Sequence, residues 1–209
     1  MAVAGQIVET INLLPALHFA NLRLNVMAKG SFLTISWTRN EGLLNVVVSQ
    51  KAHLFSCEAR VKPEWIDQNG HMNMGYYMVA FDSIATAGFY DAIGLGIEQK
   101  LRLGKTTFTL AANIDYLREV HEGDLLLFTT QLIDYDRKRL HYMHCMYQAK
   151  EGYLAATNEC LGMYIDLSTR RGTEFSLLQM ERFQQELERC AAVEPPATLA
   201  RKLGIRRNH

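Results

Sequence analysis

Four strand-like segments follow one another between residues 106 and 167, joined only by short polar connections. Aromatic and β-branched residues, which are typical of β-strands, are frequent in the segments TTFTLAANIDYL, DLLLFTTQLIDYD, RLHYMHCMYQAK and YLAATNECLGMYIDL. Consecutive strands can run parallel only when a long crossover connects them. The connections here are too short for a crossover, so the sequence predicts an antiparallel sheet with turns at Glu122-Gly123, Arg137-Lys138 and Glu151-Gly152.

One apolar helix is predicted immediately before these strands, over about residues 74–93. Asn73 is a suitable N-cap, and Gly94 and Gly96 end the helical pattern. At ~1.5 Å per residue the helix is about 30 Å long, enough to cross a domain. One face is expected to be buried against the sheet, since apolar or small residues recur there at helical spacing: Tyr77, Phe81, Ile84, Ala85, Gly88 and Ala92.

The order of these elements defines the predicted fold class. A short strand, CEARVK, precedes the helix, and a second, more exposed helix is expected after Ser176, with Leu177, Met180, Phe183 and Leu187 at helical spacing. Strand, long helix, four strands and helix make an α+β domain in which one antiparallel sheet can curl around one central helix. We place this domain at residues 55–192 and expect a loose basic tail at residues 193–209.

Residues 1–54 are expected to form an N-terminal extension of unknown structure. The segment INLLPALHFANLRLNVMA is interrupted by proline, asparagine and arginine, and it lacks the basic start and continuous apolar block of a signal peptide. We expect a short helix pair or an unstructured arm there, although SFLTISW and LLNVVVSQ, farther along, have the composition of strands. Met27 lies within this region and is a candidate start of a shorter product.

The charge balance gives no general attraction for large charged partners. Twenty-two basic residues stand against 22 acidic ones, and a pI near 7.1 provides no field that would attract nucleic acid or an anionic membrane. Charged or turn residues interrupt most apolar stretches before the roughly 18 positions that a membrane helix needs. The cysteines are scattered without a CxxC pair. We therefore expect a reduced, cytoplasmic protein with a small-molecule partner.

A polar run, DQNGHMN, occupies residues 67–73 directly before the apolar helix. Two interpretations are open. Asparagine and glycine form turns and asparagine caps helices, so the run can be a simple connection. Alternatively, it places the carboxylate of Asp67 and the imidazole of His71 beside the free amides of the helix N-terminus, where residues 74–76 could stabilise an oxyanion. Asp67 would then act as a nucleophile or as a general base on water.

The element order and the segment DQNGHMNMGYY resemble the hotdog-fold acyl-CoA thioesterases. The pattern of that family is an Asp, two residues, Gly-His, an Asn two positions further on, and a Tyr just inside the central helix. The matching positions are Asp67, Gly70, His71, Asn73 and either Tyr76 or Tyr77. The resemblance covers about residues 57–168, and VKPEWIDQNGHMN and LREVHEGD are especially similar to thioesterases that act on betainyl-CoA and related small acyl-CoAs.

The resemblance implies an activity and an assembly. The chain is expected to adopt the hotdog fold and to hydrolyse a small or medium acyl-CoA to free acid and CoA, without a cofactor. Such proteins pair their sheets edge to edge, so a homodimer or homotetramer with active sites at the subunit boundary is expected. Catalysis is assigned to Asp67, His71 and Asn73, and substrate binding to Trp65, Gly70, Met74, Gly75, Tyr76 and Tyr77.

Further side chains are candidates for binding charged groups. Trp65, Tyr76 and Tyr77 could form an aromatic wall for a cationic acyl group, with core packing as the alternative. The CoA phosphates could be met by local cations or these cations could belong to solvated turns, the candidates being Arg118, Arg137, Lys138 and Arg139.

A metal site is not expected. The segment HYMHC contains His141, His144 and Cys145, which are possible ligands. Side chains three residues apart on a strand point to opposite faces of the sheet, so the two histidines cannot easily share an ion.

The sequence leaves two other classes of function open. Hotdog dehydratases use a histidine with an acidic residue of the central helix, and the available acids are Asp82, well beyond the cap, and Asp91, near the far end. A non-enzymatic acyl-CoA binding protein would keep the fold without needing Asp67. Release of free thiol from a panel of acyl-CoAs separates these classes, because a dehydratase leaves the thioester intact and a binding protein turns nothing over.

Overall fold

The computed structural model describes residues 21–28, 31–40, 43–44 and 54–199, and the chain divides into two compact units, Met1–Ala52 and His53–His209. In the first unit, β1 (Asn21–Ala28) pairs antiparallel with β2 (Ser31–Asn40), and β2 pairs with β3 (Leu43–Leu44). The prediction of a helix pair or an unstructured arm is therefore wrong over residues 21–28, where apolar and polar residues alternate as in a strand.

The strand expected for SFLTISW is confirmed by β2. Of the segment LLNVVVSQ, only the first two residues are described, and they form β3. The remaining predictions for residues 1–20 and 45–53 lie outside the described part of the chain.

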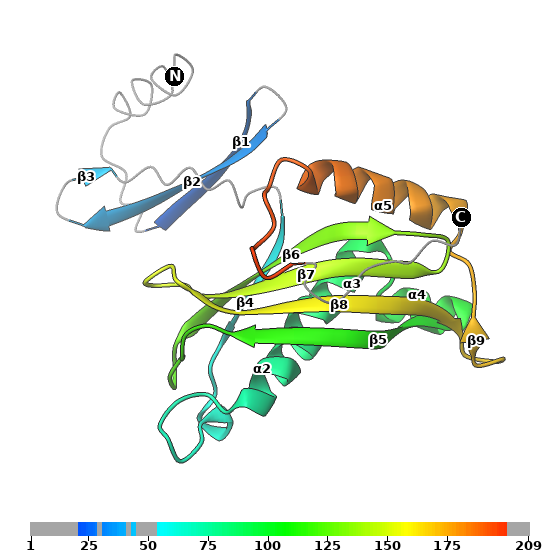
Figure 1. Ribbon diagram of the computed structural model, residues 1–209. Helices are drawn as coiled ribbons and strands as arrows, with labels where there is room; N and C mark the ends of the chain where they lie inside the picture. Colours follow the sequence, from blue (N-terminus) through cyan, green and yellow to red (C-terminus); the bar gives the residue numbers. More distant parts are fainter. Residues whose placement is uncertain (1–20, 29–30, 41–42, 45–53, 200–209) are drawn as a thin grey trace. The chain divides into compact units, whose positions relative to one another are not determined.

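The second unit is built on one antiparallel sheet with the strand order β4-β6-β7-β8-β5, and β9 pairs with β8 (Figure 1). All four strands predicted from the sequence are confirmed, as is their antiparallel pairing. The strand that follows the long helix pairs with the last long strand, so β4 and β5 lie at the two edges. The strands are β4 (Phe55–Arg60), β5 (Lys105–Tyr116), β6 (Leu125–Tyr135), β7 (Arg139–Gln148), β8 (Leu154–Asp166) and β9 (Arg171–Gly172).

The long helix has the predicted bounds but is not a regular α-helix. α2 (Met74–Ala80), a π-helical segment η3 (Phe81–Thr86) and α3 (Ala87–Ile93) follow one another without a break. Buried residues repeat at every fourth position: Tyr77, Phe81, Ala85, Phe89 and Ile93. In a regular helix of ~3.6 residues per turn this repeat drifts by about 40° at each step. The wider π turn corrects the drift, so Phe89 and Ile93 are buried, whereas the predicted Ala92 is exposed.

A buried histidine joins the π-helical segment to the sheet. His144 in β7 bonds through Nε2 to the Thr86 hydroxyl at 2.9 Å and through Nδ1 to the Thr130 hydroxyl at 2.7 Å. Its ring also stacks on Phe81 at an interplanar angle of 16°. Burial lowers the pKa of His144 from 6.5 to about 3, so the ring is neutral, with one nitrogen donating and the other accepting. The helix is thereby fixed on the middle of the sheet.

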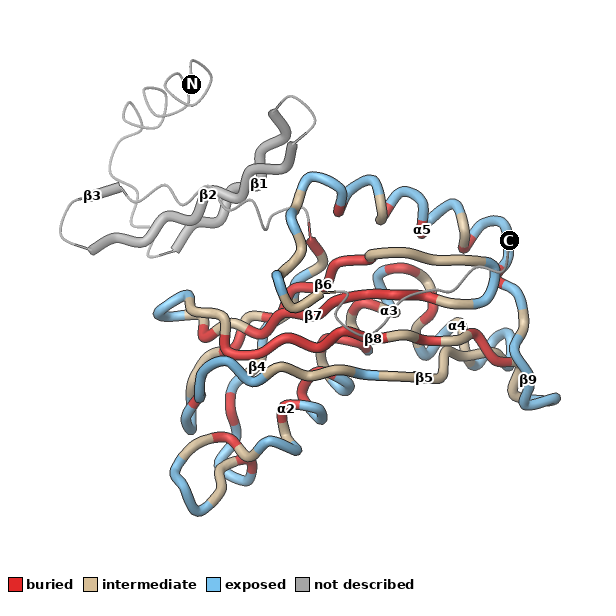
Figure 2. Tube along the Cα trace, in the orientation of Figure 1, coloured by how far each residue is buried: buried red, intermediate tan, exposed pale blue. Residues whose placement is uncertain are grey.

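The central strands β6, β7 and β8 are buried along most of their length (Figure 2). The long helix covers one face of the sheet. On the other face, the hydroxyl groups of Thr157 and Thr198 lie 3.1 Å apart, and the Gln131 side chain donates to the carbonyl of Val193 at 2.7 Å. Residues 193–199, the beginning of the expected loose tail, therefore contact the sheet, and residues 200–209 lie outside the description.

Two shorter helices complete the unit. α4 (Ile97–Leu103) is absent from the sequence prediction; it is seven residues long and buries none of them, and Ile97 and Leu101, one turn apart, are both exposed. α5 (Leu177–Cys190) confirms the predicted C-terminal helix and begins with a capping box between Ser176 and Gln179. Phe183 is buried as expected, but Leu177 in the first turn is exposed. A sheet curled around one helix, with a helix after it, is the arrangement that the hotdog resemblance predicts.

Candidate active site

The polar run before the long helix folds into a small closed loop. An isolated antiparallel bridge joins Ile66 to Met72. Inside it, the Asp67 N–H donates to the carbonyl of His71 at 3.1 Å, and the Gly70 N–H donates to the carbonyl of Asp67 at 3.0 Å. Gly70 has a φ of 81°, a left-handed conformation that a residue with a Cβ adopts only with strain. Turn formation and presentation of Asp67 are therefore combined in one loop.

The loop is attached to the rest of the unit through its backbone. The Asn73 N–H donates to the carbonyl of Trp65 at 2.9 Å, and the Met72 N–H donates to the carbonyl of Val120 at 2.9 Å. Trp65 and Met72 are buried at 5% and 1% exposure, whereas the carboxylate-bearing Asp67 is only half-buried. The connection between β5 and β6 thus holds the loop in place, a role for Val120 that its apolar side chain does not signal in the sequence.

Asn73 connects the helix cap to the carboxylate of Asp67. Its Oδ1 accepts from the Gly75 N–H at 2.9 Å, which confirms the predicted N-cap. Its Nδ2 donates to Oδ2 of Asp67 at 3.4 Å, and the Asn69 N–H donates to Oδ1 of Asp67 at 2.8 Å. Both carboxylate oxygens are therefore held, and each keeps a further lone pair for a water molecule or an acyl group. The carboxylate lies beside the positive end of the helix dipole.

The helix N-terminus offers fewer amide donors than the sequence predicts. The Gly75 amide is occupied by the Asn73 side chain, and the Tyr76 amide donates to the Asn73 carbonyl at 2.9 Å. By contrast, the Met74 N–H forms no hydrogen bond with any residue that the structure describes. Of the three amides at residues 74–76 that the sequence proposes as oxyanion donors, the cap therefore uses two and leaves that of Met74.

His71 lies in the loop but does not bond to the Asp67 carboxylate within the described residues. Its Nδ1 lies 3.3 Å from the carbonyl oxygen of Met72. A carbonyl only accepts, so Nδ1 carries a proton in this contact, and Nε2 of the neutral ring is then an acceptor. His71 can therefore accept a hydrogen bond from water or from substrate, and it does not orient Asp67 directly.

The aromatic residues of the predicted wall divide into two groups. Trp65 and Tyr76 stack with ring centroids 6.0 Å apart and an interplanar angle of 18°, and Nζ of Lys62 lies over the Trp65 ring at 5.4 Å. Tyr77 instead points into the core, edge-on to Tyr116 at 5.2 Å, and burial raises the pKa of its hydroxyl. The structure thus brings Trp65 and Tyr76 together and makes Tyr77 a packing residue.

The four cations predicted to meet the CoA phosphates lie in two places. Arg118 precedes β6, and its guanidinium stacks on Tyr153, 3.7 Å from the ring centroid. Arg137 and Lys138 lie in the β6–β7 turn and Arg139 begins β7, beyond the 11 residues of β6, which span about 35 Å at ~3.3 Å each. There Arg137 pairs with Glu174 at 2.8 Å, and Arg139 pairs with a carboxylate of its own turn at 2.6 Å. The structure therefore does not gather these cations at the loop.

The histidines of HYMHC have separate partners. His144 is enclosed between two threonine hydroxyls, whereas Nε2 of His141 lies 2.8 Å from a carboxylate oxygen of Glu159. Within the described segments no three His, Cys, Asp or Glu side chains are grouped as metal ligands. None of the helices in these segments is both long enough and apolar enough to cross a membrane.

The family comparison agrees with the loop and the fold. A model of the Thioesterase-like superfamily matches residues 61–203. A curated relative, the betainyl-CoA thioesterase of Pseudomonas aeruginosa, is 33% identical over 152 residues, which cover 73% of this chain and 95% of that protein. The residues that match the family model include the loop, the long helix and the strands after it.

Solved structures support the same relationship. A Staphylococcus aureus protein characterised in complex with CoA superposes with a TM-score of 0.67 at 31% identity, covering 78% of this chain and 99% of that one. The 1,4-dihydroxy-2-naphthoyl-CoA thioesterase of Synechocystis has a TM-score of 0.54 at 18% identity, covering 64% of this chain and 95% of that one, and supports the fold alone.

Replacing Asn73 separates its two contacts. Asn73→Ala removes both the cap and the donor to Asp67. We therefore expect the free energy of unfolding to fall by about 1 kcal/mol and the thermal midpoint to fall by roughly 2–4 °C. Asn73→Ser keeps an oxygen that can accept from the helix amides and should retain the parental midpoint within about 2 °C. Equal midpoints for Asn73→Ala and the parent, measured by differential scanning calorimetry, would show that this residue does not cap the helix.

Proposed function

Because the chain belongs to the Thioesterase-like superfamily, we propose that its chemistry takes place at Asp67. The protein hydrolyses an acyl-CoA thioester to the free acid and CoA. The observation that supports the site is the position of the Asp67 carboxylate, held at both oxygens beside the N-terminus of α2. Catalytic roles are proposed also for Asn73, which donates to the Asp67 carboxylate, and for His71, which lies in the same loop.

Asp67 can serve the reaction by two routes that give the same products. As a general base, its carboxylate takes a proton from water while the water oxygen adds to the thioester carbonyl. The tetrahedral oxyanion then collapses, the carbon–sulfur bond breaks, and CoA leaves as the thiolate and takes up a proton. As a nucleophile, Asp67 expels the thiolate first and forms a mixed anhydride, which water cleaves. Only the second route gives an acylated protein, which rapid quenching and mass spectrometry can detect.

The neighbouring groups support either route. The Met74 N–H points from the end of the helix and is the donor proposed for the oxyanion, a type of contact whose loss costs about 10² to 10³ in turnover. Gly70 and Gly75 keep side chains away from the approaching thioester. Asn73 positions Asp67 through its amide nitrogen at 3.4 Å. Nε2 of His71, which the loop leaves as an acceptor, can bond the attacking water.

A small cationic acyl group fits the aromatic pair beside the loop. Nζ of Lys62 lies 5.4 Å from the centroid of the Trp65 ring, and this ring is only 5% exposed. Tyr76 stacks on Trp65 and is half-buried, so its ring is the member of the pair that can receive a further positive charge. The relative from Pseudomonas aeruginosa is named a betainyl-CoA thioesterase, and the betainyl group carries a quaternary ammonium. We therefore propose betainyl-CoA or a related small cationic acyl-CoA as the substrate.

The protein is proposed to work as a homodimer, which is one of the two assemblies expected from the sequence. β5 is an edge strand and carries Leu110, which is 51% exposed, and Tyr116, which is 48% exposed. Next to its end, Met74 and Val79 on α2 are also exposed, at 68% and 46%. Exposed strand edges are normally paired or covered. Pairing β5 with its counterpart in a second copy would cover both surfaces.

Asp67→Asn tests the catalytic proposal directly. The charge disappears, so turnover should fall by about 10² or more, while KM should change little. An amide can accept from only one of the two groups that now bond the carboxylate, so we also expect a midpoint lower by about 2–4 °C. Asp82→Asn, which neutralises an exposed carboxylate farther along the helix, is the matched control and should keep parental turnover. An Asp67→Asn enzyme that retains more than about a third of parental turnover contradicts positioned-base or nucleophilic catalysis.

The acyl-group proposal is tested with two substrates of the same shape. Betainyl-CoA has a quaternary nitrogen at the position where 3,3-dimethylbutanoyl-CoA has a quaternary carbon, so only the acyl group of betainyl-CoA is positively charged. A cation–π contact is worth about 0.5–2 kcal/mol for each ring, so kcat/KM should favour betainyl-CoA by roughly tenfold. Free thiol release is the measurement for both. Equal values of kcat/KM for the two substrates would show that the enzyme does not select a positively charged acyl group.

Light scattering at micromolar concentration tests the assembly. The parental protein should have the mass of two chains, or a multiple of that dimer mass. Leu110→Lys places a charge on the β5 edge and should shift the mass toward the monomer. Leu177→Lys, which alters a leucine that is 80% exposed on α5, should leave the mass unchanged. A parental protein with the mass of one chain would rule out the proposed dimer.

A further inference from the structure

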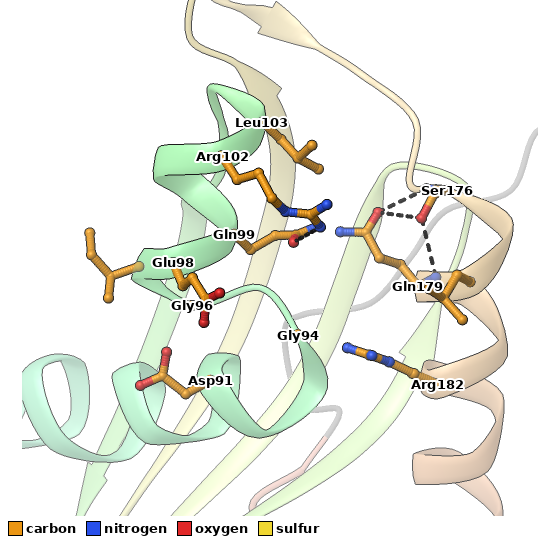
Figure 3. A pocket seen from close by; sticks show the side chains of 12 residues that line it. Asp91, Gly94, Gly96, Glu98, Gln99, Arg102, Leu103, Ser176, Gln179 and Arg182 are labelled. Atoms are coloured by element: carbon orange, nitrogen blue, oxygen red, sulfur yellow. Dashed lines mark hydrogen bonds between the residues drawn. The ribbon is translucent and has the colours of Figure 1, made fainter.

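A second polar site lies at the opposite end of the long helix from Asp67. A pocket of about 950 Å³ opens between the α3–α4 connection, α4 and the first turns of α5 (Figure 3). Its lining includes Asp91, Gly94, Gly96, Glu98, Arg102 and Arg182. None of these residues contributes to the loop that carries Asp67.

The two carboxylates of the pocket are accounted for by the fold. Gly96 is the N-cap of α4 and Glu98 stands in the first turn of that helix, where the helix dipole favours negative charge. The Asp91 carboxylate lies directly against Gly96, since a Cβ on that glycine would overlap Oδ1 of Asp91. Figure 3 shows both carboxylates on the side of the pocket formed by α3 and α4.

The two guanidinium groups are not accounted for in this way. No hydrogen bond or ion pair joins Arg182 to any residue in the described part of the chain, and Arg102 uses one donor, to Oε1 of Gln99 at 2.6 Å. A guanidinium carries five N–H donors, so most of them stay available. Figure 3 shows both side chains directed into the pocket from α4 and α5.

The backbone makes room for one of these groups. Gly94 is the C-cap of α3 with a φ of 78°. A Cβ at this position would overlap Nη1 of Arg182, so the guanidinium rests on the bare backbone of the glycine. A side chain here would displace Arg182, in addition to straining the left-handed conformation.

The arginines predicted from the sequence to meet the CoA phosphates have partners within the fold. Arg137 and Arg139 pair with carboxylates, and Arg118 stacks on an aromatic ring. Arg102 and Arg182, which no motif singles out, instead face one pocket from two helices that are distant in sequence. Guanidinium groups are well suited to phosphate because their planar donors match two of its oxygens.

We infer that this pocket binds a phosphate group through Arg102 and Arg182. The phosphate belongs either to the nucleotide of CoA or to a separate phosphorylated compound. The CoA source rests on the proposed thioesterase function, whereas phosphate binding itself does not. Residues 74–93 separate the pocket from Asp67 by about 30 Å at ~1.5 Å per residue, farther than the pantetheine arm extends. CoA held here would therefore deliver its thioester to the Asp67 loop of a second copy.

Calorimetric binding of adenosine 3′,5′-bisphosphate and of inorganic pyrophosphate to the full chain tests the site. Arg182→Gln and, separately, Arg102→Gln should weaken binding of at least one probe by about tenfold, the scale for losing one charge-assisted hydrogen bond. Lys150→Gln removes the same charge from an exposed turn outside the pocket and should change binding less than about twofold. Parental affinity of both arginine variants for both probes, or no binding by the parent, overturns the inference.

Kinetics then identify the source of the phosphate. KM is compared for an acyl-CoA and for the corresponding N-acetylcysteamine thioester, which has no nucleotide. If CoA occupies the pocket, Arg182→Gln raises KM about tenfold for the acyl-CoA only, with kcat unchanged, because uniform binding is lost. If KM stays parental while probe binding is weakened, the ligand is a separate phosphorylated compound. Both results retain the phosphate site, and neither depends on the outcome for Asp67→Asn.

Discussion

The central helix must keep one face on the sheet over its whole length, and much of the second unit depends on this requirement. Its buried residues recur at every fourth position from Tyr77 to Ile93, a spacing that a regular α-helix cannot keep in line. Burying a large apolar side chain stabilises a protein by about 1.5–3 kcal/mol, so turning Phe89 and Ile93 into solvent would cost more than a local change of helical pitch. The π-helical segment η3 is that change.

The polar contacts of His144 fix the position of this segment. A buried imidazole with an unmet nitrogen would be costly, but the hydroxyls of Thr86 and Thr130 satisfy both ring nitrogens. Burial keeps the ring neutral by lowering its pKa to about 3. Because Thr86 ends the π-helical segment and Phe81 begins it, His144 contacts both ends. The helix is thereby held in one register on β7, and its two termini are placed at opposite ends of the sheet.

Polar and charged side chains gather at each terminus of the helix, and a glycine lies in each of these two groups. At the N-terminus, Gly70 closes the turn and Asn73 links the cap to the carboxylate of Asp67. At the C-terminus, Gly94 ends α3 and leaves space for Arg182. The apolar middle of the helix contributes stability, while the ends expose backbone and charged groups to ligands. In a dimer paired through β5, the helix N-terminus of one copy and the helix C-terminus of the other could contact the same substrate molecule.

Local patterns in the sequence determined the antiparallel strands, the bounds of the long helix, its Asn73 cap and the turn that presents Asp67, because each depends on residues close together in the chain. Long-range packing decided the rest. It selected Phe89 and Ile93 over Ala92 for burial, turned Tyr77 inward while Tyr76 stayed beside Trp65, and paired some arginines while leaving Arg182 in a pocket. These outcomes depend on which side chains meet across the sheet and between helices, and such contacts join residues that local periodicity does not relate.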